Sequence, residues 1–373
     1  MVWSRIMKHI DEYRSHELSK RLLDKIKGAI SRPWRLMEVC GGQTHAILRH
    51  GIDEALEGYI QLLHGPGCPV CVTPESAIDQ MVELSRSEGF IVVSFGDMLR
   101  VPGTRESLLQ SKSNGADVRI VYSPLDVLKI AHAHPKNEVV FFAVGFETTA
   151  PATAITLQQA AALSLRNVSM LASHVRVLPA MEFIANSPES QVDGFLGAGH
   201  VCTITGYEAY QKLVDQYSLP IAITGFEPVD LLRGILKCVQ MLESGQPGVA
   251  NVYERSVRVE GNAAAMDCFN DVYEVADSPW RGLGNITAGG LSLKSKYERF
   301  CAKQKFSLPI VNKSCQQECR SGDVMTGKIR PPECPHFGVS CTPDHPIGAP
   351  MVSSEGACSA YFRYRMERES QRT

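Results

Sequence analysis

The sequence lacks the features that would direct a chain into or across a membrane. No apolar run reaches the roughly 18 residues that a membrane-spanning helix needs. The opening stretch MVWSRIMKHIDEYRS contains neither an apolar core segment nor a small-residue cleavage site, so we expect no signal peptide. We therefore expect a cytoplasmic protein with no membrane partner.

An excess of charge of one sign is also missing. The chain has 38 Lys and Arg against 40 Asp and Glu, a formal net charge of −2. Without a basic excess there is no electrostatic reason to expect nucleic acid as a partner. The chain is nevertheless long, with 373 residues of which 44% are hydrophobic, and this is enough for two or three domains with real cores.

Cysteine is too scarce for a disulfide scaffold, because 12 in 373 residues lies well below the roughly 8–10% of such proteins. In a reducing compartment we expect core thiols, metal ligands or catalytic groups. Four cysteines lie among apolar or mixed helical residues and are expected to be buried or partly buried: Cys202, Cys238, Cys268 and Cys301. The others form an N-terminal and a C-terminal group: Cys40, Cys68 and Cys71, and Cys315, Cys319, Cys334, Cys341 and Cys358.

A short apolar run, a turn and a helical pattern alternate along the first two thirds of the chain. This alternation predicts βα units and parallel sheets. We expect two Rossmann-like α/β domains, 31–125 and 126–235, preceded by an amphipathic helix over 1–30 that packs on the rest. The predicted strands are LMEV, YIQLLH, FIVVSFG, VRIVYS, VVFFAVGF, VSMLASH, VDGFLGAGH and LPIAITGF.

Reactive side chains follow these predicted strands. Ligands of open α/β sheets bind outside the carboxyl ends of the strands, so these side chains are expected to face one cleft between two domains. Each acid or histidine alone has a structural alternative, because such residues also cap helices and satisfy loops. The candidates are Cys40, His45, Cys68, Cys71, Asp97, Glu147, His174, His200 and Glu227.

The motif Cys68-Pro-Val-Cys71 is a C-x-x-C followed by Pro74 and Glu75, which predict a helix start. At a helix start one thiol has a lowered pKa and the other can close a disulfide, which favours a redox-active pair. Half of a zinc site and two unreactive loop thiols are the alternatives. No second pair of similar spacing follows closely in the sequence.

Cys40 is followed by Gly41 and Gly42, which allow the backbone to approach a ligand closely. His45 comes one helical turn later. A thiolate in this position is either a nucleophile or a ligand for a soft metal ion.

The C-terminal region, 236–373, is rich in Gly and Pro and has little periodicity, so it needs more than a large core to hold it. Its cysteines are spaced more widely than the C-x₂₋₄-C pairs of structural zinc. Four thiolates from such loops favour an iron–sulfur cluster, with zinc as the alternative. We expect the ligands to be Cys319, Cys334, Cys341 and Cys358, with Cys315 in competition with Cys319.

Several long motifs resemble those of the HypD family of hydrogenase maturation factors, and the similarity extends over essentially the whole chain. They are MEVCGGQTHAI, HGPGCPVCVTP, FGDMLRVPG, GADVRIVYSPLDVLKIA, VVFFAVGFETTAPATAITL, GFEPVDLL, WRGLG and GAPMVSSEGACSAYFRY. The resemblance implies two α/β domains of related fold and a C-terminal domain with one [4Fe–4S] cluster. It implies a scaffold that assembles the Fe(CN)₂CO part of [NiFe]-hydrogenase with the small chaperone HypC. HypE, working with HypF, would deliver the cyanide ligands.

The resemblance also assigns roles to residues. Cys40 would bind the iron, Cys68 and Cys71 would be the redox-active pair, and the cluster would take Cys334, Cys341 and Cys358. Relatives often carry the fourth cluster cysteine where this chain has Ser321, and Cys319 is its natural substitute.

Two functions follow as hypotheses. The first is a redox-active assembly scaffold rather than a conventional turnover enzyme. The second is a cluster-containing thiol–disulfide reductase, in which Cys40 attacks a protein disulfide.

Overall fold

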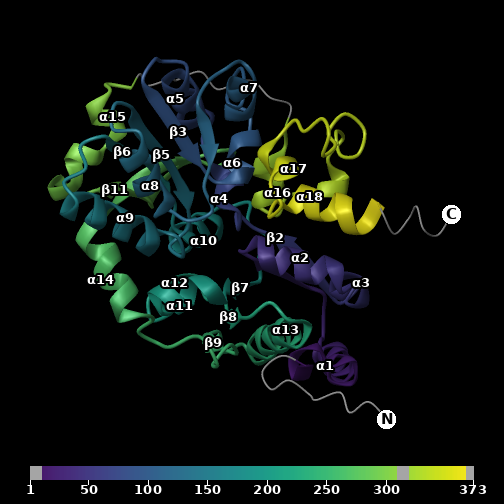
Figure 1. Ribbon diagram of the computed structural model, residues 1–373. Coiled ribbons are helices and arrows are strands. Elements are labelled where there is room, and N and C mark those ends of the chain that lie inside the picture. Colours follow the sequence, from purple (N-terminus) through teal and green to yellow (C-terminus); the bar gives the residue numbers. More distant parts are fainter. Residues whose placement is uncertain (1–10, 309–318, 367–373) are drawn as a thin grey trace, which may run out of the picture.

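The computed structural model describes residues 11–308 and 319–366 (Figure 1). The N-terminal segment forms a 3₁₀ turn, Asp11–Arg14, and helix α1, His16–Ala29, which begins where the Ser15 side chain accepts the Leu18 N–H. Helix α1 packs against α13, Pro228–Ser244, as an amphipathic helix is expected to do. Within the described residues, the segment predicted as one helix over 1–30 is thus a 3₁₀ turn followed by a shorter α-helix, and residues 1–10 lie outside the description.

The first sheet has five parallel strands in the order β2-β1-β7-β8-β9. Its central strands are almost entirely buried, which explains their apolar sequences. The strands are β1 (Trp34–Glu38), β2 (Ile60–His64), β7 (Gly194–Ala198), β8 (Ile221–Thr224) and β9 (Val249–Asn251).

The second sheet has four parallel strands in the order β4-β3-β5-β6. Strand β5 lies at its centre and is apolar after its first residue, as expected for a strand covered on both faces. The strands are β3 (Phe90–Ser94), β4 (Val118–Ile120), β5 (Glu138–Gly145) and β6 (Val168–His174).

All eight predicted strands are present, but they are grouped differently from the expectation. The boundary expected at residue 125 does not separate the two sheets. The chain leaves the first sheet after β2, builds the whole second sheet, and returns to the first sheet at β7. Local periodicity identifies a strand but carries no information about which distant strand it pairs with. The boundary at residue 235 is also displaced, because it falls inside α13.

Helices connect the strands and cover the sheets. Figure 1 shows α5, α8 and α9 around the second sheet and α13 beside the first. The helices up to residue 272 are α2 (Gly41–Arg49), α3 (Ile52–Ala55), α4 (Pro69–Val72), α5 (Glu75–Ser85), α6 (Gly96–Arg100), α7 (Leu108–Ser113), α8 (Asp126–Ala133), α9 (Ala150–Ala162), α10 (Val177–Ala185), α11 (Gly199–Thr205), α12 (Tyr210–Tyr217), α13 and α14 (Ala263–Val272).

An antiparallel hairpin, which the sequence reading did not anticipate, follows α14. Strands β10 (Tyr273–Trp280) and β11 (Gly284–Leu293) are joined by a turn in which Gly282 has a φ of 81°. Strand β11 packs beside β6 of the second sheet. This part of the expected C-terminal region therefore belongs to the body of the molecule.

The remainder is a series of short elements, in agreement with the weak periodicity of the sequence. Figure 1 shows α16, α17 and α18 (yellow) beside α2, α4 and α6, and α17 contacts α4 while α18 contacts α2. The elements are a 3₁₀ helix (Ser295–Phe300), α15 (Ala302–Lys305), α16 (Ser321–Met325), a 3₁₀ turn (Pro331–Glu333), α17 (Ala349–Val352), α18 (Ala357–Tyr361) and a π-helical turn (Phe362–Met366).

The four cysteines expected to pack as small hydrophobes do so. Cys202 and Cys238 are buried, and Cys268 and Cys301 are partly buried. Across residues 11–308 and 319–366, no helix combines the length and the apolar character needed to cross a bilayer.

Candidate thiol site and four-cysteine pocket

The loops after β1 and β2 bring the two N-terminal cysteine motifs together. Cys40 is the N-cap of α2 and Cys68 is the N-cap of α4. The Gly41 N–H donates to the Gly67 carbonyl over 3.0 Å. A Cβ atom on Gly67 would lie 2.3 Å from the backbone nitrogen of Cys40, so only glycine permits this contact.

The Cys40 thiol is buried beside an imidazole. Its Sγ lies 3.6 Å from His200 Nδ1. Burial, assisted by the nearby Glu38 carboxylate, raises the pKa of Cys40 to about 12, and burial lowers the pKa of His200 to about 4. Near neutral pH a protonated thiol therefore faces a neutral imidazole.

The buried side chain of Glu38 holds the loop that contains Cys40 through hydrogen bonds. Glu38 is fully buried, accepts the Cys40 N–H over 2.7 Å, and also accepts the Thr44 hydroxyl. His64 Nδ1 lies 2.7 Å from Glu38, and His64 Nε2 lies 3.1 Å from the Tyr361 hydroxyl. The sequence reading missed this network, although a glutamate within the apolar run LMEV was a signal for it.

The Cys68 and Cys71 sulfurs are bonded as a disulfide, with an S–S distance of 2.12 Å. The short helix α4 starts directly after Cys68, and α5 starts at Glu75 as the Pro74-Glu75 pair predicted. The backbone N–H of Cys71 donates to Cys68 Sγ over 3.1 Å. The structure thus confirms that these two cysteines pair, and their reversible cycling stays a prediction.

The segment after α17 covers this disulfide. Ser353 is buried, and its Oγ lies 3.3 Å from Cys68 Sγ. The Ser354 N–H and hydroxyl both donate to Asp97, over 2.9 and 2.7 Å. Although burial alone would raise it, the hydrogen bonds from Ser354 and Arg100 lower the pKa of Asp97. Asp97 therefore anchors the covering segment beside the disulfide.

The other predicted side chains make separate contacts. His45 Nδ1 lies 3.3 Å from the Tyr364 hydroxyl, so it faces the C-terminal segment. Glu227 pairs with Arg14 over 2.8 Å near the start of α13. Both contacts join segments that are far apart in the sequence, and we interpret them as structural.

At the carboxyl ends of β5 and β6 lie two further predicted residues. Glu147 accepts the Val177 N–H at the start of α10, and burial raises its pKa to about 7. His174 is buried, with Nε2 3.2 Å from the Thr153 hydroxyl. These contacts tie both side chains to the second sheet rather than to the Cys40 loop.

The C-terminal cysteines line a single pocket. The pKa of Cys358 is raised above its ordinary value, mainly because its sulfur is buried and to a smaller extent because other thiols lie near it. The Ile347 N–H donates to Cys341 Sγ over 3.4 Å, and a Cβ on Gly348 would lie 2.1 Å from Cys319 Sγ. The pocket lining includes Cys319, Cys334, Cys341, Cys358, His336, Phe337, Ile347, Gly348, Pro350 and Met351.

These four sulfurs surround a pocket rather than converge on a point. Within the described part of the chain, no three His, Cys, Asp or Glu side chains are placed to hold one metal ion. Soft sulfur donors, an apolar lining and a backbone N–H directed at sulfur fit an iron–sulfur cluster. Cys315, the alternative ligand, lies outside the described residues.

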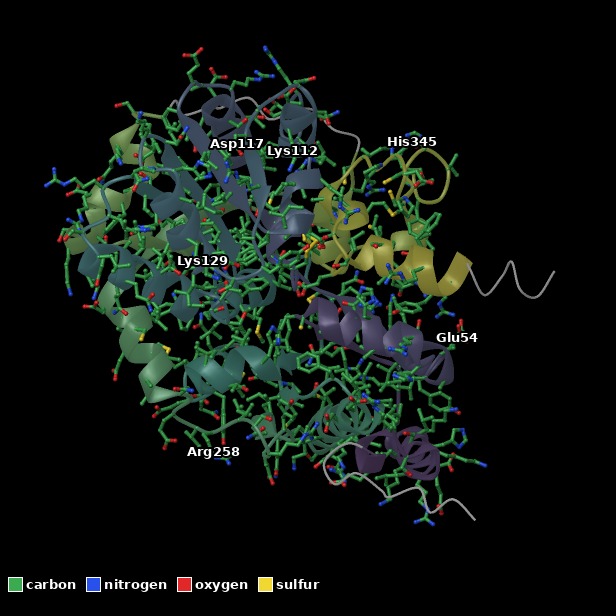
Figure 2. The ribbon with its side chains drawn as sticks, in the orientation of Figure 1. Glu54, Lys112, Asp117, Lys129, Arg258 and His345 are labelled. Atoms are coloured by element: carbon green, nitrogen blue, oxygen red, sulfur yellow. A yellow bond between two sulfur atoms is a disulfide. The ribbon has the colours of Figure 1, made fainter. Side chains whose placement is uncertain are left out.

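The disulfide and the four-cysteine pocket adjoin. Val324 and Pro350 line the four-cysteine pocket and also a small cavity that contains Cys68 and Cys71. In Figure 2, sulfur atoms (yellow) are seen where the C-terminal segment meets the rest of the molecule, and the labelled His345 lies on the outer loop of that segment. The thiol chemistry of the chain is therefore concentrated at one junction.

Fold and site together define a parallel-sheet α/β protein in which a disulfide adjoins a four-cysteine pocket. The family model HypD, described as "Hydrogenase formation hypA family", matches residues 17–365. The chain belongs to this HypD family of hydrogenase maturation factors.

Curated relatives agree with this assignment along nearly their entire length. Hydrogenase maturation factor HypD of Escherichia coli K12 is 44% identical over 370 residues, covering 97% of this chain and 99% of the relative. The protein of the same name from Rhodobacter capsulatus is 42% identical, with 96% and 98% covered. That of Azotobacter vinelandii is also 42% identical, with 98% of each chain covered.

Proposed function

We propose that this chain is the scaffold on which the Fe(CN)₂CO group of [NiFe]-hydrogenase is assembled. The observation that carries this proposal is the junction just described. It places a buried thiol–imidazole pair, a disulfide and a four-cysteine pocket at the meeting point of three parts of the chain. The membership in the HypD family supports the same role.

Cys40 is the residue that holds the iron being built. A soft thiolate suits an electron-rich iron, and metal binding requires the thiol to lose its proton. The neutral imidazole of His200 lies 3.6 Å from this sulfur and can hydrogen-bond to it. Gly41 and Gly42 let the Glu355 backbone and the Phe226 ring pack closely against the start of α2, next to Cys40.

Cys68 and Cys71 exchange electrons at this junction. When the dithiol closes to the disulfide it releases two electrons and two protons, and the reverse step takes them up. Both sulfurs line the cavity that also contains Gly41, the residue after Cys40. This arrangement supports a pair that cycles between two states during assembly.

Cys319, Cys334, Cys341 and Cys358 would hold a [4Fe–4S] cluster, which supplies one-electron transfer when bound. The protein's contribution is to insulate that centre and to link it to the disulfide. Val324 and Pro350 lie between the two sites and are the side chains that both share.

The partners proposed for the scaffold are a HypC-like chaperone and a HypE protein that delivers cyanide with HypF. The resemblance to the family motifs suggests them, and the chemistry is consistent because cyanide and CO must come from outside this chain. The iron with its ligands is then cargo that passes through the site.

Infrared spectroscopy on the Cys40→Ala variant tests this function. Purified with its partners, the wild-type protein should show CN and CO bands, and the variant should lose them but keep the absorption of its cluster. The matched control is Cys238→Ala, which removes a buried thiol whose hydrogen-bond partner is the Phe195 carbonyl of β7. Full CN and CO bands in Cys40→Ala would refute the scaffold role of this residue.

The Cys68–Cys71 disulfide also agrees with the second hypothesis, a thiol–disulfide reductase. A thiol–disulfide reductase would turn over protein disulfides without CN or CO bands, and would lose that turnover in Cys40→Ala. The same two preparations therefore separate the two functions.

A further inference from the structure

The covering segment touches the disulfide through one hydroxyl. Ser353 Oγ lies 3.3 Å from Cys68 Sγ and also accepts the Glu355 N–H over 3.2 Å. A disulfide sulfur carries no hydrogen, so the hydrogen in the Ser353–Cys68 contact must come from the hydroxyl. Ser353 therefore donates to Cys68.

Two donors thus converge on one sulfur of the pair. The Cys71 N–H donates to Cys68 Sγ over 3.1 Å, and the Ser353 hydroxyl is the second donor. Donors of this kind interact more strongly with a thiolate than with a disulfide sulfur, because hydrogen bonds to a charged acceptor are roughly twice as strong. Both hydrogen bonds therefore favour the state in which Cys68 carries the negative charge.

Groups besides the Ser353 hydroxyl also hold the segment in place. Its backbone N–H caps α17 by donating to Ala349 over 3.0 Å. The neighbouring Ser354 anchors the segment to Asp97 with its own hydroxyl and N–H. The Ser353 hydroxyl, at a residue only 1% exposed, is directed at the sulfur.

We propose that Ser353 selects Cys68 as the thiolate of the 68–71 couple and shifts the couple toward its reduced form. This inference rests on the redox function proposed above for the pair. In the reducing step an external dithiol loses two electrons and becomes a cyclic disulfide. The Cys68–Cys71 bond breaks, Cys68 leaves as a thiolate, Cys71 takes up one of the two protons that the dithiol loses, and the other proton goes to solvent.

The test is the redox equilibrium of the full-length protein in buffers of reduced and oxidised dithiothreitol, read by alkylation and mass spectrometry of the 68–71 peptide. Ser353→Ala should favour the disulfide about tenfold, equivalent to about 30 mV for a two-electron couple. Ser353→Thr, which keeps the hydroxyl, should stay near wild type. Ser354→Ala is the matched control and should also leave the equilibrium unchanged.

Alkylation of the reduced protein at one fixed pH gives the second readout. Ser353→Ala should slow the modification of Cys68 several-fold and leave Cys71 unaffected, which a general loosening of the fold would not do. An unchanged equilibrium and unchanged Cys68 reactivity in Ser353→Ala would overturn the inference alone. A wild-type pair that cannot be cycled at all would overturn the proposed redox function together with it.

Discussion

At the scale of single residues, the protein buries a carboxylate whose loss of hydration is costly. Glu38 has no exposed surface, and three donors converge on it: the Cys40 N–H and the Thr44 hydroxyl at the start of α2, and His64 of β2. Such a carboxylate is tolerated only because each of these donors compensates its lost hydration. It fixes the loop that presents Cys40.

Removal of the Glu38 carboxylate should therefore be costly. Glu38→Ala is expected to lower the free energy of unfolding by about 3 kcal/mol or more, because it leaves buried donors unpaired. Glu38→Gln, which keeps one acceptor oxygen, should cost less. Urea unfolding followed by circular dichroism measures both, and equal stability of Glu38→Ala and wild type would contradict this account.

The raised pKa of Glu147 predicts that the stability of the folded protein depends on pH. Burial raises its pKa from an ordinary 4.5 to about 7, so the folded protein holds this proton more tightly than the unfolded chain. Between pH 4.5 and 7 the folded state binds more protons, and its stability falls as the pH rises through that window. The contribution is up to about 3 kcal/mol.

The comparison uses Glu147→Gln, whose amide oxygen can still accept the Val177 N–H. The variant should gain stability over wild type at pH 8 and lose that advantage at pH 5. A constant difference between the two proteins across this range would show that Glu147 does not titrate in this window.

At the scale of elements, the site depends on loops that meet without side chains between them. The turn after β2 contacts the backbone of the turn after β1 at Gly67 and Cys40. The carboxyl ends of two neighbouring parallel strands can approach so closely only because glycine occupies this position.

Gly67→Ala should separate these loops. Its Cβ would lie 2.3 Å from backbone atoms that cannot move aside, so we expect a loss of about 3 kcal/mol in unfolding free energy. The control is Gly28→Ala in α1, where the new methyl group meets nothing within 4 Å. Unfolding midpoints of the two variants should differ clearly, and a Gly67→Ala protein as stable as Gly28→Ala would contradict the contact.

The elements also show what sequence reasoning can and cannot reach. Strands such as β5 were found because burial on both faces leaves a continuous apolar run. The hairpin β10–β11 was missed because its strands carry mixed, partly exposed residues.

Within the site, the pairing of Cys68 with Cys71 followed from spacing and a helix start. The contacts of Ser353 and Tyr361 did not, because they join residues nearly 300 positions apart in the chain. The signal for such a contact lies in the fold and not in any local pattern. Glu227 was expected in the cleft for its position after a strand, yet its carboxylate pairs with Arg14.

At the scale of the whole molecule, the C-terminal segment joins the two halves. It contacts α2 of the first sheet and α4 at the start of the second, and it carries the four-cysteine pocket. The junction therefore exists only when all three parts are in place.

The identity of the fourth cluster ligand can be decided on the intact protein. Cys319→Ser, prepared anaerobically, should lose the cluster and its roughly four irons per chain, because Cys319 lines the pocket with the other three cysteines. Cys315→Ser should keep them. Iron and sulfide analysis of both proteins gives the answer, and the opposite pattern would show that Cys315 is the ligand.

The strands of the second sheet lie in the sequence between strands β2 and β7 of the first sheet. This order has a consequence for synthesis on the ribosome. The second sheet is encoded as one uninterrupted stretch and can form early, whereas β1 cannot pair with β7 until β7 emerges. The C-terminal segment, which carries Ser353 and the four pocket cysteines, emerges last of all. An unfinished chain therefore carries Cys40, Cys68 and Cys71 without the segment that covers them, and only the completed polypeptide contains the whole site.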